Sequence, residues 1–400
     1  MSFRVTETMK FQGMVDNLFR VQRDYTKLME QMTTQKTINR PSDDPLGMTR
    51  VAACRSSLTS IEQYKRNINT ARSWITMTES KLTAIDDLIV KARETAVAGA
   101  SATASADSRQ TGAVAVGQLT DELLSLANGV FGDRYLFAGT KVDEAPFSAD
   151  YAGPTIGDPK AAGGNAFDGS LSASGTYSGA TNKTLVVKIV AGGDLGEAAY
   201  QLSGDGGRTW SAVYDDLESG TITLGDGINL TFVDDGSEHL AIGDVFMVEA
   251  RAPGYYRGNG EELTLDINRE TGSAYSLTGE DVFTAHGAEG VDIFETFHNL
   301  RQALEENDQG GIEEALEDLK KASAQISRAE TLCGTKINRL DIAESNLTAL
   351  EGKLTEMISA TEDVDLTELI TQFSMKETVL QASYAMISKI ESASILEFLK

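Results

Sequence analysis

The sequence contains few cysteines, and this scarcity excludes two classes of protein. Two cysteines in 400 residues cannot hold a disulfide-rich scaffold. Neither Cys54 nor Cys333 stands in a Cys-x-x-Cys or histidine-rich context, so no metal site is expected. Both residues keep the phase of helical heptads, and we expect them to be free thiols that fill helix cores.

Motifs for catalysis are also missing. The three histidines, His239, His286 and His298, match no metalloprotease spacing. We find no phosphate-binding loop, no dinucleotide-binding glycine pattern and no serine-hydrolase elbow. We therefore expect no enzyme activity, no catalytic residues and no cofactor.

Basic residues are outnumbered, with 35 Lys and Arg against 60 Asp and Glu and a formal net charge of −25. Nucleic acid and anionic lipid both select cationic surfaces, so neither is an expected partner. No apolar run reaches the roughly 18 residues that suggest a membrane span, and membrane insertion is not expected. The first ten residues lack the apolar centre of a secretory signal, so we expect no cleaved signal peptide.

The six prolines leave long stretches towards both ends of the sequence free of helix breakers, and a seven-residue apolar repeat occupies those stretches. The first stripe has spacings of three and four residues, as one face of a helix requires. Its members are Phe11, Met14, Leu18, Val21, Tyr25, Leu28 and Met32. The segment 39–47, with Pro41 and Pro45, ends this helix, and Ser42, Asp43 or Asp44 can cap the next one.

Longer heptads follow at 47–104 and again at 312–358, and they predict two long helices. A third helix is predicted through Val116 to Val130 after a connector at 100–108, and a short one from Ile293 to Leu304. A terminal helix is predicted from Leu366 onward, with one apolar face. Its members are Leu366, Leu369, Ile370, Phe373, Leu380, Tyr384, Ile387 and Ile390.

The middle of the chain has a different composition. The segment 144–290 holds 25 of the 37 glycines and a net charge of 7 − 23 = −16. Short β-branched runs at 184–190, 221–224, 228–233 and 244–249 alternate with glycine turns, which predicts antiparallel hairpins. The fold class is therefore mainly α with a β insert. The two helical arms form a long antiparallel bundle or coiled-coil rod, and an all-β domain is inserted at its tip.

One motif in the insert requires two interpretations. Residues 203–210 fit the Asp-box pattern through Ser203, Asp205, Gly207, Thr209 and Trp210. The pattern resembles a hairpin repeated in sialidases, where several copies build a propeller, but this chain has one copy. We favour a structural hairpin in which the aspartate caps the turn and the tryptophan plugs the hairpin against its sheet. A glycan-binding or sialidase-like role is the alternative.

Four blocks resemble the flagellin superfamily. They are the opening at 3–6, the corner from Asn39, Arg40 and Pro41 through Ser42, Asp43 and Asp44 to Pro45, the block 126–147, and the C-terminal block 363–384. The first and third blocks are more similar to subunits of the hook–filament junction than to filament subunits. The insert has no clear match.

The resemblance implies a structural protein of the bacterial flagellum that self-assembles through its terminal helices. Segments 1–46 and 362–400 would line an inner tube, 47–147 and 290–361 would form a helical rod, and 148–289 would be a glycine-rich acidic β-domain facing outward. The implied partners are copies of itself in a ring, a neighbouring hook-side junction protein, filament flagellin, and an export chaperone at the C-terminal helix. The implied location is extracellular, on the flagellum, after type III export.

The residues themselves suggest why such ends would order only on assembly. Each end has one narrow apolar stripe, and an isolated helix of this length is marginally stable in water. Burial against neighbours, at roughly 0.8 kcal/mol per CH₂, would offset the ordering entropy. The alternatives left open are a filament flagellin and, from a different class, a glycan-active or adhesive protein built on the insert.

Overall fold

The computed structural model describes residues 7–167, 169–194, 197–215, 217, 220–233, 240–269, 272–284 and 290–398. His239 and His286 lie outside these residues. The chain divides into two compact units, one formed by 1–65 with 344–400 and the other by 66–343. The boundary passes through two long helices, α2 (Pro45–Ala100) and α6 (Gln309–Glu362), which contribute to both units.

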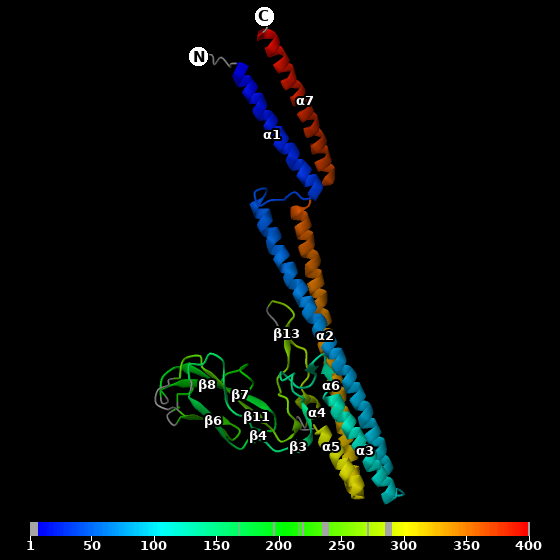
Figure 1. Ribbon diagram of the computed structural model, residues 1–400. Helices are drawn as coiled ribbons and strands as arrows, with labels where there is room; N and C mark the ends of the chain where they lie inside the picture. The colour runs from blue at the N-terminus through cyan, green and yellow to red at the C-terminus, as the bar shows by residue number, and fades with distance from the viewer. Residues whose placement is uncertain are drawn as a thin grey trace. The chain divides into compact units, whose positions relative to one another are not determined.

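The first unit joins the two ends of the sequence. Helix α1 (Glu7–Thr34) runs antiparallel to α7 (Leu366–Phe398), and the two lie side by side (Figure 1). The start of α2 lies beside the end of α6, where Lys65 Nζ contacts Glu351 Oε2 at 2.5 Å. The predicted antiparallel pairing of the N- and C-terminal helices is confirmed.

The helices of the second unit follow the predicted heptads. The remaining parts of α2 and α6 are joined by Arg72–Asp341 at 2.7 Å and Asp86–Ser323 at 2.8 Å. Helices α3 (Ala106–Ala127), α4 (Gly279–Phe283) and α5 (Ile293–Glu305) complete the helical part. Many of the predicted heptad residues are buried, although Leu316 and Ile337 are half-buried. The buried residues include Ile68, Ile75, Leu82, Ile89, Val116, Ile312, Leu319, Ile326 and Leu340.

The third helix ends earlier than the heptad predicted. Asn128 caps α3, and Val130 belongs to a short hairpin of β1 (Val130–Phe131) and β2 (Arg134–Tyr135). The Leu136 N–H donates to the Gly129 carbonyl, which fixes the chain reversal. Val130 is exposed, so the prediction that it extends the helical stripe is wrong.

The glycine-rich segment forms antiparallel sheets, as predicted. The four predicted strands are β7 (Lys183–Ala191), β9 (Thr221–Gly225), β10 (Ile228–Val233) and β11 (Val245–Arg251). The pattern missed shorter strands. They are β3 (Phe147–Ala152), β4 (Thr155–Ile156), β5 (Lys160–Ala161), β6 (Ser170–Gly175), β8 (Ala199–Ser203), β12 (Gly254–Tyr256), β13 (Thr264–Asp266) and β14 (Gly272–Ala274).

Two of the sheets share one core. The order in the larger is β4-β11-β7-β8, with β5 also paired to β11, and in the smaller β6-β10-β9. The rings of Phe167, Phe232 and Phe246 meet edge to face in this core. Hairpin β9–β10 turns at Asp226 and Gly227, both with positive φ, as a tight turn of this kind requires.

Both cysteines are free and buried, as predicted. Burial, with a further contribution from the Glu79 carboxylate, raises the pKa of the Cys333 thiol to about 12. A thiol held neutral in this way is a packing residue rather than a nucleophile. In the described part of the chain, no helix combines the length and apolarity that crossing a bilayer requires.

Candidate assembly surfaces

The N-terminal stripe lies along the contact between α1 and α7. Met14, Leu18, Val21, Tyr25 and Leu28 are half-buried, and none is fully covered. Met32, at the end of the stripe, is exposed. The side chain of Phe11 lies outside the described residues. The seam thus retains apolar surface that a single partner helix does not cover.

The C-terminal stripe divides into two faces. Leu369 is buried, and Phe373, Leu380 and Ile387 are half-buried on the same stripe, which packs against α1. Leu366 and Tyr384 keep the spacing of three and four on this stripe but are exposed in the single chain. Ile370 is also exposed and lies about 100° around the helix from Leu369, so the prediction that the whole set shares one face is wrong at Ile370.

A second apolar stripe on α7 is open to solvent. Met375, Val379 and Met386 are exposed at spacings of four and seven residues, and Ile370 is also exposed. A helix that is apolar on several faces is usually surrounded by protein. Among the described residues, α1 is the element that packs along α7. This stripe is therefore surface available for contacts with other chains.

Polar contacts fix the register of the terminal pair. Asp24 and Lys376 form an ion pair at 2.7 Å, next to stacked rings of Tyr25 and Phe373. Both ion-pair residues are substantially exposed, so the pair contributes at most about 1 kcal/mol. The Asp24–Lys376 ion pair selects one register between α1 and α7, whose apolar stripes are otherwise uniform.

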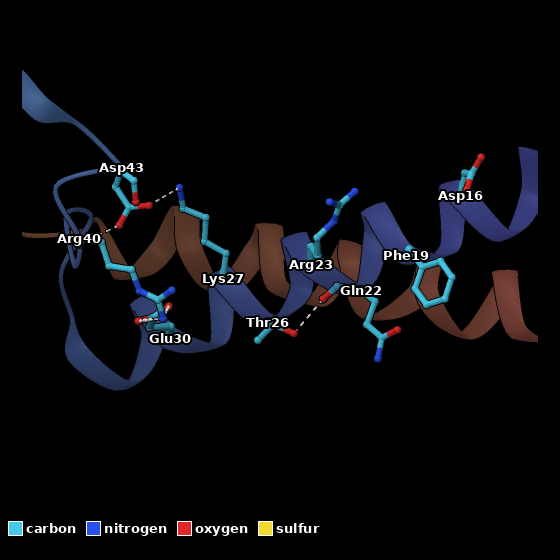
Figure 2. Close-up of a pocket in the computed structure, with 10 residues that line it drawn as sticks. Asp16, Phe19, Gln22, Arg23, Thr26, Lys27, Glu30, Arg40 and Asp43 are labelled. Atoms are coloured by element: carbon cyan, nitrogen blue, oxygen red, sulfur yellow. Dashed lines mark hydrogen bonds and ion pairs between the residues drawn. The ribbon is translucent and has the colours of Figure 1, made fainter.

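A groove of about 810 Å³ follows the face of α1 that bears Phe19 and the loop after the helix (Figure 2). Two ion pairs cross from α1 to the loop, Lys27–Asp43 at 2.9 Å and Glu30–Arg40 at 3.0 Å. The Lys27 ammonium, followed by the Arg40 backbone N–H, holds the pKa of Asp43 below its usual value. Phe19 is exposed in this groove.

The predicted corner is a turn followed by a helix cap. The Asp43 N–H donates to the Arg40 carbonyl at 2.9 Å, which closes a four-residue turn. Pro41 is the second residue of this turn, where the fixed φ of proline is favoured. The Asp43 carboxylate accepts from the backbone N–H groups of Asn39 and Arg40. Pro41 and Asp43 therefore shape the corner before the helix begins.

Asp44 is the cap of α2. Its Oδ1 accepts from the N–H groups of Leu46 and Gly47 at 3.1 and 3.0 Å, and Pro45 opens the helix. Among the three capping candidates, Ser42, Asp43 and Asp44, the structure selects Asp44. A Cβ at Gly47 would lie 2.5 Å from Asp44 Oδ2, so a larger residue there would displace the capping carboxylate.

Sequence reasoning missed Glu362, the last residue of α6. Its carboxylate is almost fully buried and contacts Lys36 Nζ at 2.8 Å and Arg55 Nη2 at 2.6 Å. The Thr37 N–H donates to its backbone carbonyl at 2.6 Å. The end of α6 is thus joined both to the loop after α1 and to the start of α2. The sequence offered one signal for this contact. It was an acidic residue at the end of a helix, with the basic residues Lys36 and Arg55 in the other helical arm.

The Asp-box hairpin has the predicted turn. Asp205 accepts from the N–H groups of Arg208 and Thr209 and from Thr209 Oγ1 at 2.6 Å. These hydrogen bonds, that of the Thr209 hydroxyl first, lower the pKa of Asp205. Ser203 Oγ donates to Asp205 Oδ1 and accepts from the Gly207 N–H, and Gly207 has a φ of +96°.

The tryptophan of the motif does not plug the hairpin. Trp210 is 36% exposed, and Lys188 Nζ of β7 lies 5.6 Å from its ring centroid. The prediction is wrong because a lysine, rather than the apolar face of a sheet, covers the ring. The cation–π contact contributes on the order of 0.5–1 kcal/mol at an exposed site.

Family models match the two helical ends. The bacterial flagellin N-terminal helical region matches residues 6–142, and the bacterial flagellin C-terminal helical region matches residues 316–399. The chain belongs to the flagellin family. Its β insert lies between the two matched regions, where neither family model extends.

Among flagellin relatives, flagellar hook-associated protein 3 of Escherichia coli is 23% identical over 99% of this chain and its own full length. The protein of the same name from Salmonella typhimurium is 31% identical over 36% of this chain and 46% of its own. A solved flagellar hook-associated protein from Vibrio parahaemolyticus has a TM-score of 0.51 at 14% identity, covering 80% of this chain and 100% of that one. That likeness shows the shared fold.

Proposed function

We propose that this flagellin-family chain is a structural subunit of the bacterial flagellum that connects hook to filament. The observation that carries the proposal is the incompletely covered α1–α7 pair. Its inner seam is half-buried, and a further apolar stripe through Met375, Val379 and Met386 is exposed. Such surface favours packing among chains. The Escherichia coli relative, matched over its full length, and the partly matched Salmonella typhimurium relative are both named flagellar hook-associated protein 3, which favours a position at the hook.

The arrangement proposed for assembly follows from these surfaces. The terminal segments 1–46 and 362–400 form the inner tube, the helical segments 47–147 and 290–361 form the rod, and the acidic segment 148–289 faces outward. The net charge of −16 in 144–290 suits a surface that must stay soluble. Copies of the chain form a ring between a hook-side junction protein and flagellin.

Export and location are part of the same proposal. The chain leaves the cell through the flagellar type III apparatus without a cleaved signal, and α7 is the site for an export chaperone. An exposed apolar stripe on α7 needs cover before assembly, which favours a chaperone there. We also propose that the chain has no enzyme activity, since the Asp-box carboxylate is fully engaged in its own turn.

Electron microscopy of a deletion strain tests the junction role. Hooks without filaments, with flagellin shed into the medium and rescue by the intact gene, are expected. Loss of the filament subunit itself, with hooks and junctions intact, would instead identify a filament flagellin. For the glycan alternative, hydrolysis of a sialoside by the full chain would contradict a purely structural role.

A further inference from the structure

A narrow ribbon joins the β insert to the helical part of its unit. The chain enters the insert through β3 and leaves through β12, and these two strands pair with each other rather than with the larger sheets. The chain then continues through residues 259–267, here called the return segment, towards α4. A two-stranded ribbon is by itself marginally stable, so it fixes the direction of an attached domain weakly. Lys141–Glu249 at 2.5 Å is one contact that supports it.

The Asp-box turn makes a second contact with the return segment. The backbone N–H of Arg208 donates to Asp205 inside the turn at 3.0 Å, while the guanidinium reaches outside it, where Nη2 donates to the Glu262 carbonyl at 2.8 Å. Gly206, with a φ of +71°, lies so close to the Glu261 carboxylate that a Cβ would overlap it. The turn therefore packs directly on the return segment.

The return segment is in turn held by the two long helices. Lys336 Nζ of α6 contacts Glu262 Oε1 at 2.6 Å and donates to the Ala274 carbonyl at 3.3 Å. Asn67 Nδ2 of α2 donates to the Asp266 carbonyl at 2.8 Å. All these residues belong to the second unit. A continuous series of polar contacts thus runs from the Asp-box turn through Glu262 to α6.

We propose that the Asp-box turn is a latch that fixes the orientation of the β insert against the helical part of its unit, with Arg208 as the positioning residue. The Asp205 carboxylate holds the turn in one shape, so the Arg208 side chain starts from a fixed place. The latch gives the insert a second attachment, away from the β3–β12 ribbon. This role accounts for a single copy of the motif and does not depend on the flagellar function.

Double electron–electron resonance on the full chain tests the latch. Spin labels at Ser174→Cys on β6 and Ser327→Cys on α6, both exposed positions, report the distance between the insert and the helices. Cys54 and Cys333 are buried and should not take the label. We expect one narrow distance distribution for the parent chain. Arg208→Ala should lower the ratio of latched to displaced chains about fivefold, as one hydrogen bond of ordinary net strength implies.

Two further variants separate the latch from the stability of the hairpin. Lys336→Met removes the anchor of the return segment while the Asp-box stays intact, and it should also broaden the distribution. Lys160→Ala, an exposed basic residue elsewhere in the insert, is the matched control for the loss of one positive charge and should change nothing. The melting temperature of Arg208→Ala should equal that of the parent, because Asp205 keeps its backbone donors.

Three results would overturn the proposal. The first is an unchanged distance distribution in Arg208→Ala. The second is equal broadening in Lys160→Ala, which would make the effect one of net charge. The third is a lower melting temperature of Arg208→Ala without any change in distance, which would assign the residue to the stability of its hairpin alone.

Discussion

Tyr25 of α1 and Phe373 of α7 stack with ring centroids 4.8 Å apart and planes 29° apart. The contact joins the two ends of the sequence, and the Asp24–Lys376 ion pair lies next to it. Both rings are only half-buried in one chain. The stack therefore helps to set the register of the terminal pair while part of each ring stays exposed to solvent.

Assembly should depend on the inner seam of α7. Leu380→Asp, or Phe373→Asp, places a charge on the stripe that packs on α1 and should abolish motility and polymer formation. The second unit should stay folded, which circular dichroism and thermal melting would show. Thr378→Asp, on an exposed side of the same helix, is the matched control and should still assemble. A motile Leu380→Asp strain would contradict the prediction that assembly depends on this seam.

The two prolines of the corner should fix the direction in which α2 leaves α1. Pro41→Ala with Pro45→Ala frees φ at both positions and relaxes the residues before them. We expect impaired motility and a loss of roughly 0.4–1 kcal/mol of unfolding free energy for each proline. Ser42→Ala in the same loop serves as the control. Normal swimming of the double variant would refute the hinge argument.

Glu362 should stabilise the junction between the terminal pair and the start of α2. Glu362→Gln removes the charge that Lys36 and Arg55 share and should lower the unfolding free energy by about 1–3 kcal/mol. Hydrogen exchange at the Thr37 and Val364 amides should accelerate, since both bonds lie at this junction. Glu356→Gln, exposed on α6, controls for the loss of one charge. Equal melting temperatures of Glu362→Gln and Glu356→Gln would contradict a stabilising role for Glu362.

Stability of the second unit should fall as pH rises. Burial raises the pKa of Glu280 from 4.5 to about 7, and burial likewise raises the pKa of Asp292 from 3.8 to about 6. The folded state therefore binds more protons, and stability is lost between roughly pH 4 and pH 7, by on the order of a few kcal/mol. Urea midpoints from pH 4 to 8 measure this. Combined Glu280→Gln and Asp292→Asn should flatten the slope, and an unchanged slope would contradict the assignment.

The Asp-box aspartate should be structural. Asp205→Ala removes the acceptor of two backbone N–H groups and two hydroxyls, and should destabilise the insert by about 1–3 kcal/mol. Limited proteolysis of the insert should become faster, while motility persists. Asp215→Ala, an exposed acid in the following loop, is the comparison. Lost motility in a variant whose insert stays protease-resistant would point to a functional role for Asp205.

The helical part was predictable because the information is local. A repeat of three and four residues places Ile68, Ile75 and Leu82 on one stripe, and the structure buries all three. The corner was predictable for the same reason, since Pro41 and Pro45 restrict their own φ angles. Val130 and Trp210 were not predictable in this way. Their surroundings depend on a short hairpin and on Lys188, which no local period encodes.

The sequence by itself determined the helical ends, the corner and the acidic glycine-rich insert, because period, proline and charge act residue by residue. Only the tertiary structure decided which stripe of α7 meets α1, that Asp44 rather than Ser42 caps α2, and that Glu362 lies between Lys36 and Arg55. It also decided that Glu280 Oε2 is buried without a hydrogen-bond donor among the described residues. These features arise from contacts between distant segments, and their energies exist only once the chain is folded.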